Sequence, residues 1–535
     1  MIPSPYVVPA IIVVTLATVA IGAYGLRLAR TTSDFLVASR SVSPTWNAAA
    51  IGGEYLSAAS FLGVAGLILK YGVDVLWYPV GFAAGYLALL LFVAAPLRRS
   101  GAFTLPDFCE LRLRSRRLRK LATAFVVFIG WLYLVPQMQG AGLTLNTVTG
   151  ASYLWGVLLV GVLVTASVAL GGMRSITFVQ AFQYWLKLTA LAVPVIFLLM
   201  AWQASQRQPI SEPVFRQDTT VVVQHPVRLD GAIVPAGTEI RFEAGDPVPR
   251  VESVPRNDGL RWLVPGGQSL FATYSLILAT FLGTMGLPHV LVRFYTNPDG
   301  RAARRTTLAV LALVGAFYLF PTLYGVLGRI YTPQLLMTGK TDAVVLLLPG
   351  AVLGHGVLGQ LLGALVAAGA FAAFLSSSSG LLTSVAGVLS TDVLGRGSVR
   401  DFRLSAIVAG AVPMLLSSLV SGLDVSQVVG MAFAVAASSF CPLLVLGIWW
   451  RGLTDVGAAA GVLAGGGAAI TAVLLTVGGI RAPGWMSVLI SQPAAWTVPL
   501  AFTVMVLVSL ATRHRLPPTV STTMLRLHAP DALRL

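Results

Sequence analysis

Residues 52–60 read Gly52-Gly53-Glu54-Tyr55-Leu56-Ser57-Ala58-Ala59-Ser60. They lie in the middle of an apolar run, residues 45–69, that is long enough to cross a bilayer as a helix. A charge inside a bilayer is costly, and a glycine weakens a helix interior by roughly 1 kcal/mol. We therefore predict that this helix is broken and that Glu54 faces the protein interior. Close packing of small residues against a neighbouring helix is the alternative interpretation.

A second interruption lies in the apolar run 268–290, where the chain reads Gly283-Thr284-Met285-Gly286-Leu287-Pro288-His289. Pro288 lacks an amide proton and disfavours a straight helix. Two interrupted helices in corresponding places of two halves indicate a transporter site at an inverted repeat. We therefore predict a repeat of five plus five spans, with residues 45–202 as the first unit and 268–450 as the second.

The composition places this chain of 535 residues in the membrane, because 56% of them are apolar and only 10% are charged. Soluble domains carry about 25% charged residues. We count about 13 apolar runs of membrane-spanning length, so the fold class expected is an all-α polytopic membrane protein, with three helices outside the repeat. The runs are 6–26, 45–69, 75–97, 121–145, 152–171, 178–202, 268–290, 306–328, 352–390, 404–421, 425–450, 456–477 and 488–511.

The net charge of +16 does not indicate a nucleic-acid partner, because the basic residues sit in short loops between apolar runs. Alternate loops hold 24 and four Lys and Arg residues. The positive-inside rule assigns the richer set to the cytoplasm. We therefore expect a multi-pass protein of the cell membrane, with its N-terminus outside and its C-terminus inside.

Two segments lie outside the spans of this single domain, 1–535. The extracytoplasmic insertion 203–267 contains β-branched residues interrupted by Asp230-Gly231 and Ala236-Gly237, which predicts short β-hairpins. A surface insertion without a role in transport is the simpler interpretation, and a cap or gate is the alternative. The cytoplasmic tail, residues 512–535, is too short for an enzyme domain.

The ninth run offers oxygen ligands for a cation. Ala373, Ser376 and Ser377 have the spacing that places them on one face of a helix. Two hydroxyls and a carbonyl on that face, together with carbonyls freed at the break near Gly53, would suit a hard monovalent cation such as sodium. Serines in a membrane helix also pack, or bond back to their own helix, and this alternative stays open.

Several motifs resemble those of the sodium:solute symporter family, and the resemblance covers residues 34–511. They are the loop Ser33–Arg40, the stretch Gly171-Gly172-Met173-Arg174-Ser175, and the run from Phe440-Cys441-Pro442 to Gly457. Residues 54–63, 283–295 and Val179-Gln180 are most similar to the cation/acetate, or monocarboxylate, branch of that family.

The resemblance implies a leucine-transporter-type fold and a sodium site. Its ligands would be the carbonyls of Gly53, Leu56 and Ala373 and the hydroxyls of Ser376 and Ser377. Gly53 stands where alanine is common in the family, which is harmless if only its carbonyl binds. Gln180 stands where many sugar and proline members have an aspartate, so a second sodium site there is in doubt.

The resemblance further implies sodium-coupled symport of a small monocarboxylate such as acetate, propionate or pyruvate. We expect the substrate at the midplane near Ser57, Ala58, Gln137 and Thr284, because the half-helix after the break offers free amides and partial positive charge to a carboxylate. Gln137 has a helix–helix hydrogen bond as its alternative role.

Glu54 is a candidate for coupling, either by tuning ion choice or by carrying a proton. Pairing with Lys187 or with a backbone amide is the structural alternative. Alternative functions are sodium- or proton-coupled symport of an amino acid, sugar or vitamin, and a transporter-like solute sensor. An enzyme is not expected, because the sequence has no nucleophile–base pair, metal cluster or phosphate-binding loop.

Overall fold

The structure is a computed structural model. It describes residues 4–28, 42–205, 214–223, 226–252, 262–266, 269–354, 356–395, 398–420, 422–480 and 483–529. The loop motif Ser33–Arg40 lies outside the described residues, as does the side chain of Arg174.

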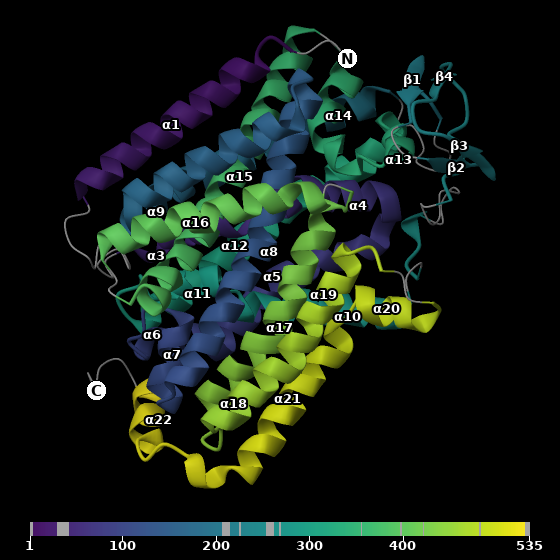
Figure 1. Ribbon diagram of the computed structural model, residues 1–535. Helices are drawn as coiled ribbons and strands as arrows, with labels where there is room; N and C mark the ends of the chain where they lie inside the picture. The colour runs from purple at the N-terminus through teal and green to yellow at the C-terminus, as the bar shows by residue number, and fades with distance from the viewer. Residues whose placement is uncertain are drawn as a thin grey trace.

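Helices make up nearly all of the described chain, and two small β-sheets lie outside them (Figure 1). The helices of the first part are α1 (Val7–Leu28), α3 (Pro44–Tyr55), α4 (Val64–Tyr71), α5 (Trp77–Ala88), α6 (Ala94–Arg99), α7 (Leu105–Leu113), α8 (Arg116–Thr149) and α9 (Tyr153–Ala204). Those of the second part are α10 (Leu270–Gly286), α11 (Pro288–Phe294), α12 (Gly300–Tyr331), α13 (Leu335–Thr338), α14 (Val344–Leu353), α15 (Val357–Val388), α16 (Val399–Leu416), α17 (Val425–Trp449), α18 (Asp455–Gly461), α19 (Gly467–Val477), α20 (Trp485–Ser491), α21 (Ala494–Ala511) and α22 (Val520–His528). Single π-helical turns cover Ala59–Gly63, Leu89–Val93, Leu389–Val393 and Val462–Gly466.

Eleven helical segments among the described residues are long and apolar enough to cross a membrane, or up to 12 with the bent pair α10–α11. The sequence predicts about 13 spans, and the difference lies in the second and third. The chain turns at Gly72, whose φ is 74°, but helical structure continues on both sides of it. Residues 59–99 therefore form one continuous helical segment, in which the sequence places parts of two spans, while α3 alone is too short to count.

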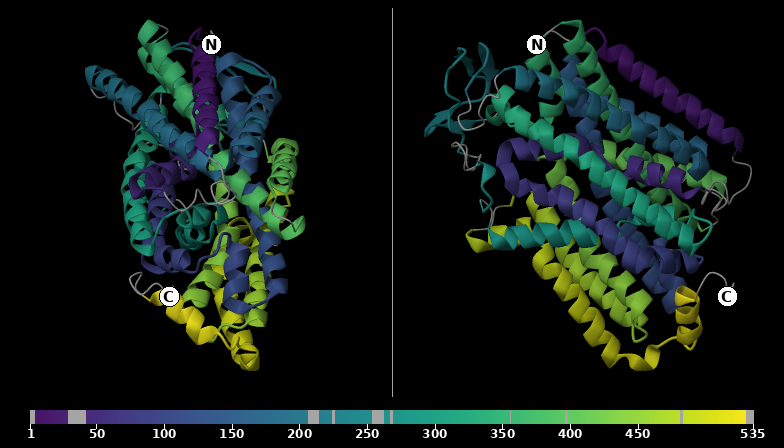
Figure 2. Two further views of the ribbon diagram at one scale, coloured as in Figure 1. Left: turned by 90° about the vertical axis from the view of Figure 1, so that its left-hand side faces the viewer. Right: turned by 180° about the vertical axis from the view of Figure 1, so that it is seen from behind.

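The centre of the molecule is α15, which packs against α8, α9 and α3. The two outermost layers are formed by α1, which covers α9 and α15, and by α21, which covers α10, α17 and α18 (Figure 2). Almost every residue of α15 from Val366 to Val388 is buried, so this helix meets protein rather than lipid on all sides. The polar residues of α15 are thereby placed inside the bundle.

The insertion between α9 and α10 forms two antiparallel pairs of strands. Strand β1 (Thr219–Val222) pairs with β4 (Glu239–Phe242), and β2 (Val227–Leu229) pairs with β3 (Ala232–Val234). The β2–β3 turn is Asp230-Gly231, where both φ angles are positive, at 48° and 85°. A two-residue turn with positive φ at both residues matches the right-handed twist of the strands that it joins. Strands β2 and β3 thus form a short hairpin in the segment where the sequence predicts such hairpins.

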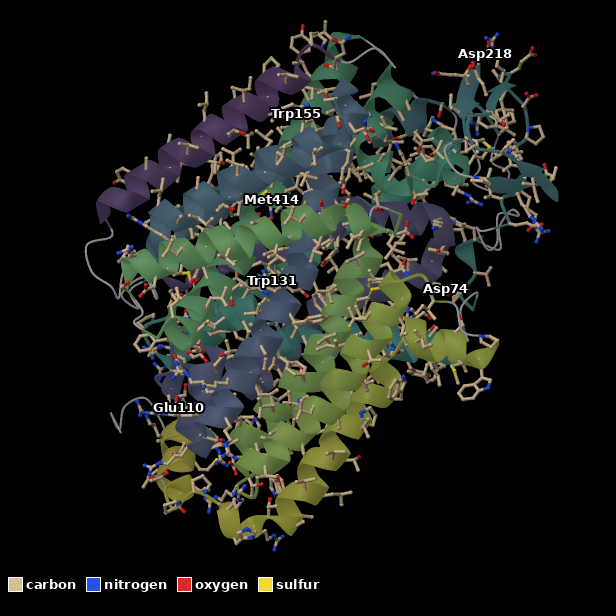
Figure 3. All side chains as sticks on the ribbon, in the orientation of Figure 1. Asp74, Glu110, Trp131, Trp155, Asp218 and Met414 are labelled. Carbon is tan, nitrogen blue, oxygen red and sulfur yellow. The ribbon has the colours of Figure 1, made fainter. Side chains whose placement is uncertain are left out.

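Polar clusters mark the two ends of the bundle, and Figure 3 shows Glu110 and Asp218 far apart at opposite ends. At the end with the hairpins, Lys70 pairs with Asp424 at 3.1 Å, and Asp342 accepts the amide proton of Val425 at 2.9 Å. The first contact joins the end of α4 to the start of α17, and the second joins the turn before α14 to the same point.

At the other end, Arg119 of α8 contacts three carboxylates. Its guanidinium nitrogens lie 2.7 Å from Asp107, 2.6 Å from Glu110 and 2.6 Å from Asp392. The first two belong to α7 and the third to the π-helical turn that follows α15. This cluster therefore ties three elements together.

The tail contains the helix α22, which packs against α6. Its buried side chains are Met524 and Leu527, and the His528 ring lies 4.9 Å from the ring of Trp449. This helix is thus folded onto the end of the bundle that carries Arg119.

Candidate functional site

The predicted break in the second span is present. Helix α3 ends at Tyr55, Leu56 has φ −75° and ψ 86°, and helical structure resumes at Ala58. The amide of Leu56 still bonds back to the carbonyl of Gly52 at 3.0 Å, but the carbonyls of Gly53, Glu54 and Leu56 are left for other donors. The C-terminal end of a helix carries partial negative charge, so these carbonyls attract cations.

The second predicted interruption is also present, because α10 and α11 meet at Leu287 with a bend of 43°. Thr284, near the end of α10, lies beside the first break, with its hydroxyl 2.9 Å from the hydroxyl of Tyr55. The two interrupted helices therefore touch at the positions where each loses its regular structure.

The two serines of α15 meet the broken end of α3, as the sequence predicts. Ser376 Oγ lies 2.7 Å from the carbonyl oxygen of Gly53 and 3.1 Å from that of Ala373. Ser377 Oγ donates to the carbonyl oxygen of Glu54 at 2.5 Å. Ser376 thus lies beside two of the expected ligands, the carbonyls of Gly53 and Ala373, whereas Ser377 meets the carbonyl of Glu54, which is not among the five. The carbonyl of Leu56 has another partner.

That partner is Lys187 of α9, which is completely buried. Its ammonium donates to the carbonyl oxygen of Leu56 at 2.6 Å and also to the carbonyl oxygen of Gly53. Two of the five oxygens expected to hold sodium therefore hold an ammonium instead. The ligand set does not fit a sodium ion while Lys187 keeps this position.

Glu54 pairs with Arg293 rather than with Lys187. The Nε of Arg293 lies 2.6 Å from a carboxylate oxygen of Glu54, and the two side chains are 1% and 2% exposed. Arg293 also donates to Thr177 at 2.8 Å and to the side-chain oxygen of Gln180. Assigning Arg293 to a cytoplasmic loop is therefore wrong, because it belongs to α11 and is buried among α3 and α9.

Gln180 joins this network to the serine helix. Its side-chain nitrogen donates to the carbonyl oxygen of Ser376 at 2.8 Å, while its side-chain oxygen accepts from Arg293. An amide side chain can donate and accept at once, whereas an ionised carboxylate only accepts. The glutamine therefore bridges a guanidinium and a carbonyl, which an aspartate at this position would not do.

Two glycines allow these helices to approach closely. A Cβ added at Gly53 would lie 2.2 Å from the carbonyl oxygen of Gln180, and one added at Gly380 would lie 2.1 Å from the Glu54 carboxyl carbon. The glycine at position 53 is therefore required by the contact between α3 and α9.

The residues expected to bind substrate surround the break from the other side. Gln137 of α8 accepts the amide proton of Ala58 at 2.9 Å, and Tyr133 donates to the hydroxyl of Ser57 at 3.4 Å. Gln137 thus forms a helix–helix hydrogen bond at the first turn after the break. It occupies the position at which a carboxylate oxygen would meet that amide.

His289 is a further polar residue at this place, and it was not singled out from the sequence. It follows Pro288 at the start of α11, is 2% exposed, and neither ring nitrogen has a hydrogen-bond partner. Its ring lies 5.2 Å from that of Tyr133. A histidine directly after a helix-breaking proline was the available signal.

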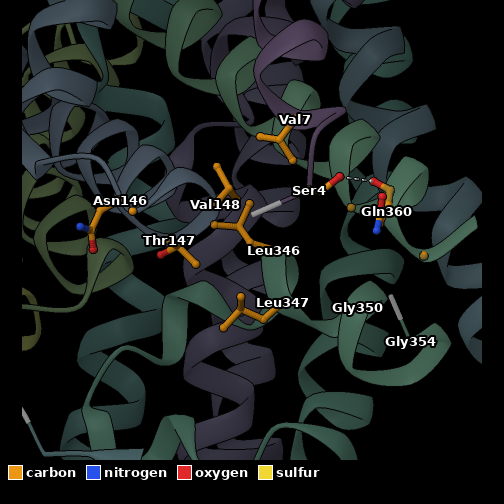
Figure 4. A pocket seen from close by; sticks show the side chains of 13 residues that line it. Ser4, Val7, Asn146, Thr147, Val148, Leu346, Leu347, Gly350, Gly354 and Gln360 are labelled. Atoms are coloured by element: carbon orange, nitrogen blue, oxygen red, sulfur yellow. Dashed lines mark hydrogen bonds between the residues drawn. The ribbon is translucent and has the colours of Figure 1, made fainter. Parts of the chain in front are cut away.

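A separate cavity of about 260 Å³ lies between α1, α8, α14 and α15 (Figure 4). Its lining includes Asn146, Leu346 and Gln360, and none of its lining residues is charged. It therefore offers no counter-charge to a carboxylate, and the polar groups at the break remain the better candidate site.

A fold of paired broken helices around a buried polar centre defines the class of secondary transporters. The model of the sodium:solute symporter family matches residues 35–465 of this chain. The chain belongs to that family, and its apolar helices make it a multi-pass protein of the cell membrane.

Two relatives are similar over most of their length. An uncharacterized symporter of Bacillus subtilis, YwcA, is 30% identical over 501 residues, which cover 91% of this chain and 90% of the relative. A monocarboxylic acid transporter of Corynebacterium glutamicum is 31% identical over 507 residues, covering 89% and 86%.

Solved structures share the fold at low sequence identity. A sodium-coupled sialic acid symporter in a substrate-bound outward-open state matches with a TM-score of 0.68 and 14% identity, covering 95% of this chain and 97% of that one. Mhp1, a nucleobase-cation-symport-1 family transporter in a closed conformation, matches with a TM-score of 0.55 and 13% identity, covering 92% and 98%.

Proposed function

We propose that this protein is a sodium-coupled symporter that imports a small monocarboxylate such as acetate, propionate or pyruvate. The observation that carries the proposal is the break at Leu56–Ser57, which meets the bend between α10 and α11 inside the bundle. Family membership supports sodium as the coupling ion, and the monocarboxylic acid transporter of Corynebacterium glutamicum supports the substrate class.

A carboxylate is the ligand that suits the half-helix starting at Ala58. The amide of Ala58 is bound by Gln137, a neutral side chain that a substrate oxygen can replace without separating charges. Ser57, Thr284 and His289 supply further hydrogen-bonding groups within the same buried region. The small side chains at Ser57 and Ala58 favour a short substrate over a sugar.

The remaining expectations about architecture belong to the same proposal. We place the first inverted repeat in residues 45–202 and the second in 268–450, with the N-terminus outside and the C-terminus inside. The hairpin insertion then lies on the outer surface, and the Arg119 cluster and α22 lie on the cytoplasmic side. Alternating access would open the bundle at the Lys70–Asp424 end and at the Arg119 end in turn.

Transport by purified protein in proteoliposomes tests the proposal. Labelled acetate should exchange by counterflow against internal acetate, propionate or pyruvate, and an inward sodium gradient should drive its accumulation. Proline and glucose, added in the same excess, should leave the exchange unchanged. If labelled acetate does not exchange, while labelled proline or glucose does, the protein carries another substrate class and this proposal is refuted.

A further inference from the structure

Three charged side chains are buried around the break, and their charges do not cancel. Glu54 and Arg293 form an ion pair at 2.6 Å and neutralise one another. Lys187 is also fully buried, yet within the described residues its ammonium meets only main-chain carbonyls. Buried charges in proteins are normally paired or bind an ion of opposite sign. One positive charge is therefore held by the broken end of α3 alone.

This is the position that suits a small cation. The carbonyls of Gly53 and Leu56 are freed because the helix stops, and they stand at the negative end of the α3 dipole. Ser376, on α15, adds its hydroxyl to the Gly53 carbonyl at 2.7 Å. A lysine ammonium is a compact charge with three donors, so it satisfies carbonyl oxygens in the way an alkali cation does.

We propose that the ammonium of Lys187 fills the cation position between α3 and α15, and that sodium is held by this oxygen set only after the ammonium has left. The inference rests on the proposed sodium-coupled transport and adds a competitor built into the chain. Two cations on the same pair of carbonyls would repel one another strongly at this depth. Sodium and the Lys187 ammonium are therefore mutually exclusive here.

The charge balance points the same way. Glu54, Arg293 and Lys187 together carry one net positive charge, which a bound monocarboxylate neutralises. A sodium ion added beside the ammonium would leave one positive charge uncompensated in the bilayer interior, where charge is costly. The charge balance therefore favours one cation at these carbonyls, either the ammonium or sodium.

The test is sodium binding to variants of the purified full-length protein, followed by the change in intrinsic tryptophan fluorescence. Lys187→Met keeps the length of the side chain and removes its charge, so the half-saturating sodium concentration should fall at least tenfold relative to wild type. Lys187→Arg retains the charge and should bind sodium no better than wild type. Adding Ser377→Ala to Lys187→Met should abolish the gain, which locates the ion beside α15.

A second measurement covers the case in which Lys187→Met is too unstable to purify. In membranes, sodium should raise the thermal unfolding temperature of Lys187→Met more than that of wild type, with potassium and choline as controls. Equal sodium affinity in Lys187→Met and wild type, or a gain that survives Ser377→Ala, would overturn the inference. A different result would separate the two proposals. If wild type exchanges no carboxylate but Lys187→Met still gains sodium affinity, the proposed substrate is refuted, and the competition between sodium and the Lys187 ammonium stands.

Discussion

At the scale of single residues, the close packing at the centre of this protein depends on two glycines, which have no side chain. Gly53 allows α3 to lie against the carbonyl of Gln180, and Gly380 leaves room for the Glu54 carboxyl group. Neither glycine has a positive φ, so each is required by close approach rather than by backbone conformation.

Gly53→Ala should destabilise the protein by about 1–3 kcal/mol, because the added methyl group overlaps the Gln180 carbonyl oxygen, 2.2 Å from the new Cβ. Gly315→Ala is the matched control, since a Cβ there meets nothing within 4 Å. Alanine favours a helix interior more than glycine does, so the control variant should be as stable as wild type or more stable by up to about 1 kcal/mol. Thermal unfolding in detergent measures both, and equal effects would contradict the packing argument.

Asp342 gives the protein a dependence on pH. Burial, reinforced by the neighbouring Asp424, raises the pKa of Asp342 to about 7, although the amide of Val425 and Lys70 oppose the shift. Its second carboxylate oxygen is buried without a hydrogen-bond partner. The folded protein therefore takes up a proton near neutral pH, where the unfolded chain, with an aspartate pKa of about 3.9, does not.

The sign follows from that difference: stability should rise as the pH falls from about 7 towards 4, and should stay at its low value above 7. Asp342→Asn removes this titration while keeping an acceptor for the Val425 amide. The variant should unfold a few degrees higher than wild type at pH 8, and the gap should close near pH 4. A gap that is constant across this range would show that Asp342 does not titrate as described.

At the scale of elements, the Arg119 cluster adds ion pairs to the packing of α7, α8 and the end of α15. Burial raises the pKa of Asp107, a shift that the charge of Arg119 opposes. Loss of the arginine would leave Asp107, Glu110 and Asp392 close together without their shared cation. Like charges in such a cluster repel, so the three elements should separate more easily.

Arg119→Gln should therefore loosen this end of the bundle, and Cys109 reports on it. Cys109 lies in α7 and is 1% exposed, and burial raises the pKa of its thiol to about 12. In a Cys441→Ala background, maleimide should label Cys109 slowly in wild type and several-fold faster in Arg119→Gln. Arg116→Gln is the control, because Arg116 is highly exposed and reaches Glu110 at only 3.8 Å. Equal labelling of all three proteins would remove the role assigned to Arg119.

The elements were largely predictable from sequence, because hydropathy and helix-breaking residues are local signals. Gly52-Gly53 and Pro288 marked both interruptions, and Asp230-Gly231 marked a hairpin turn. The sequence could not predict which residues far apart along the chain form hydrogen bonds or ion pairs with one another. Arg293 and Glu54 are 239 positions apart, and Lys187 and Gly53 are 134 apart.

No local sequence pattern predicts that the side chain of Arg293 is buried inside the bundle, and the count of basic residues assigned Arg293 to a loop. The apolar residues on either side of it, Val292 and Phe294, were the available sign that it continues a buried helix. Similarly, the spacing of Ser376 and Ser377 predicted that they share a helix face, but not that an ammonium meets the Gly53 carbonyl beside Ser376. The group that binds the free carbonyls of α3 comes from α9, and residue spacing within α3 and α15 does not predict it.

At the scale of the whole molecule, the hairpin insertion packs against the bundle, and its Phe215, Val221 and Leu229 belong to the same apolar core as the helices. Phe215 and Asp246 share a backbone hydrogen bond of 2.9 Å, so the chain enters and leaves the hairpins at adjacent points. Closer to α10, the guanidinium of Arg329 stacks over the ring of Trp262 at 5.5 Å. Excision of the hairpins can therefore leave the part next to the membrane in place.

A variant in which two glycines replace residues 216–245 loses the buried side chains of Val221 and Leu229. It should still fold and transport at a rate within about twofold of wild type, because the chain ends to be rejoined, at Phe215 and Asp246, already lie side by side. Uptake of labelled substrate in proteoliposomes measures this. Trp262→Ala, which removes a buried anchor instead of the exposed hairpins, should reduce stability more than the excision does. A tenfold loss of uptake on excision would indicate that the insertion acts as a gate.

The position of α22 has a practical consequence for watching this molecule at work. Because Met524 and Leu527 fasten that helix beside α6, a fluorophore on the exposed face, at Leu525, would be held firmly instead of drifting on a loose tether. Energy transfer from there to a dye on the hairpins would span the two opposite poles of the protein. One such pair would follow opening and closing during turnover, in single molecules, without touching the central helices.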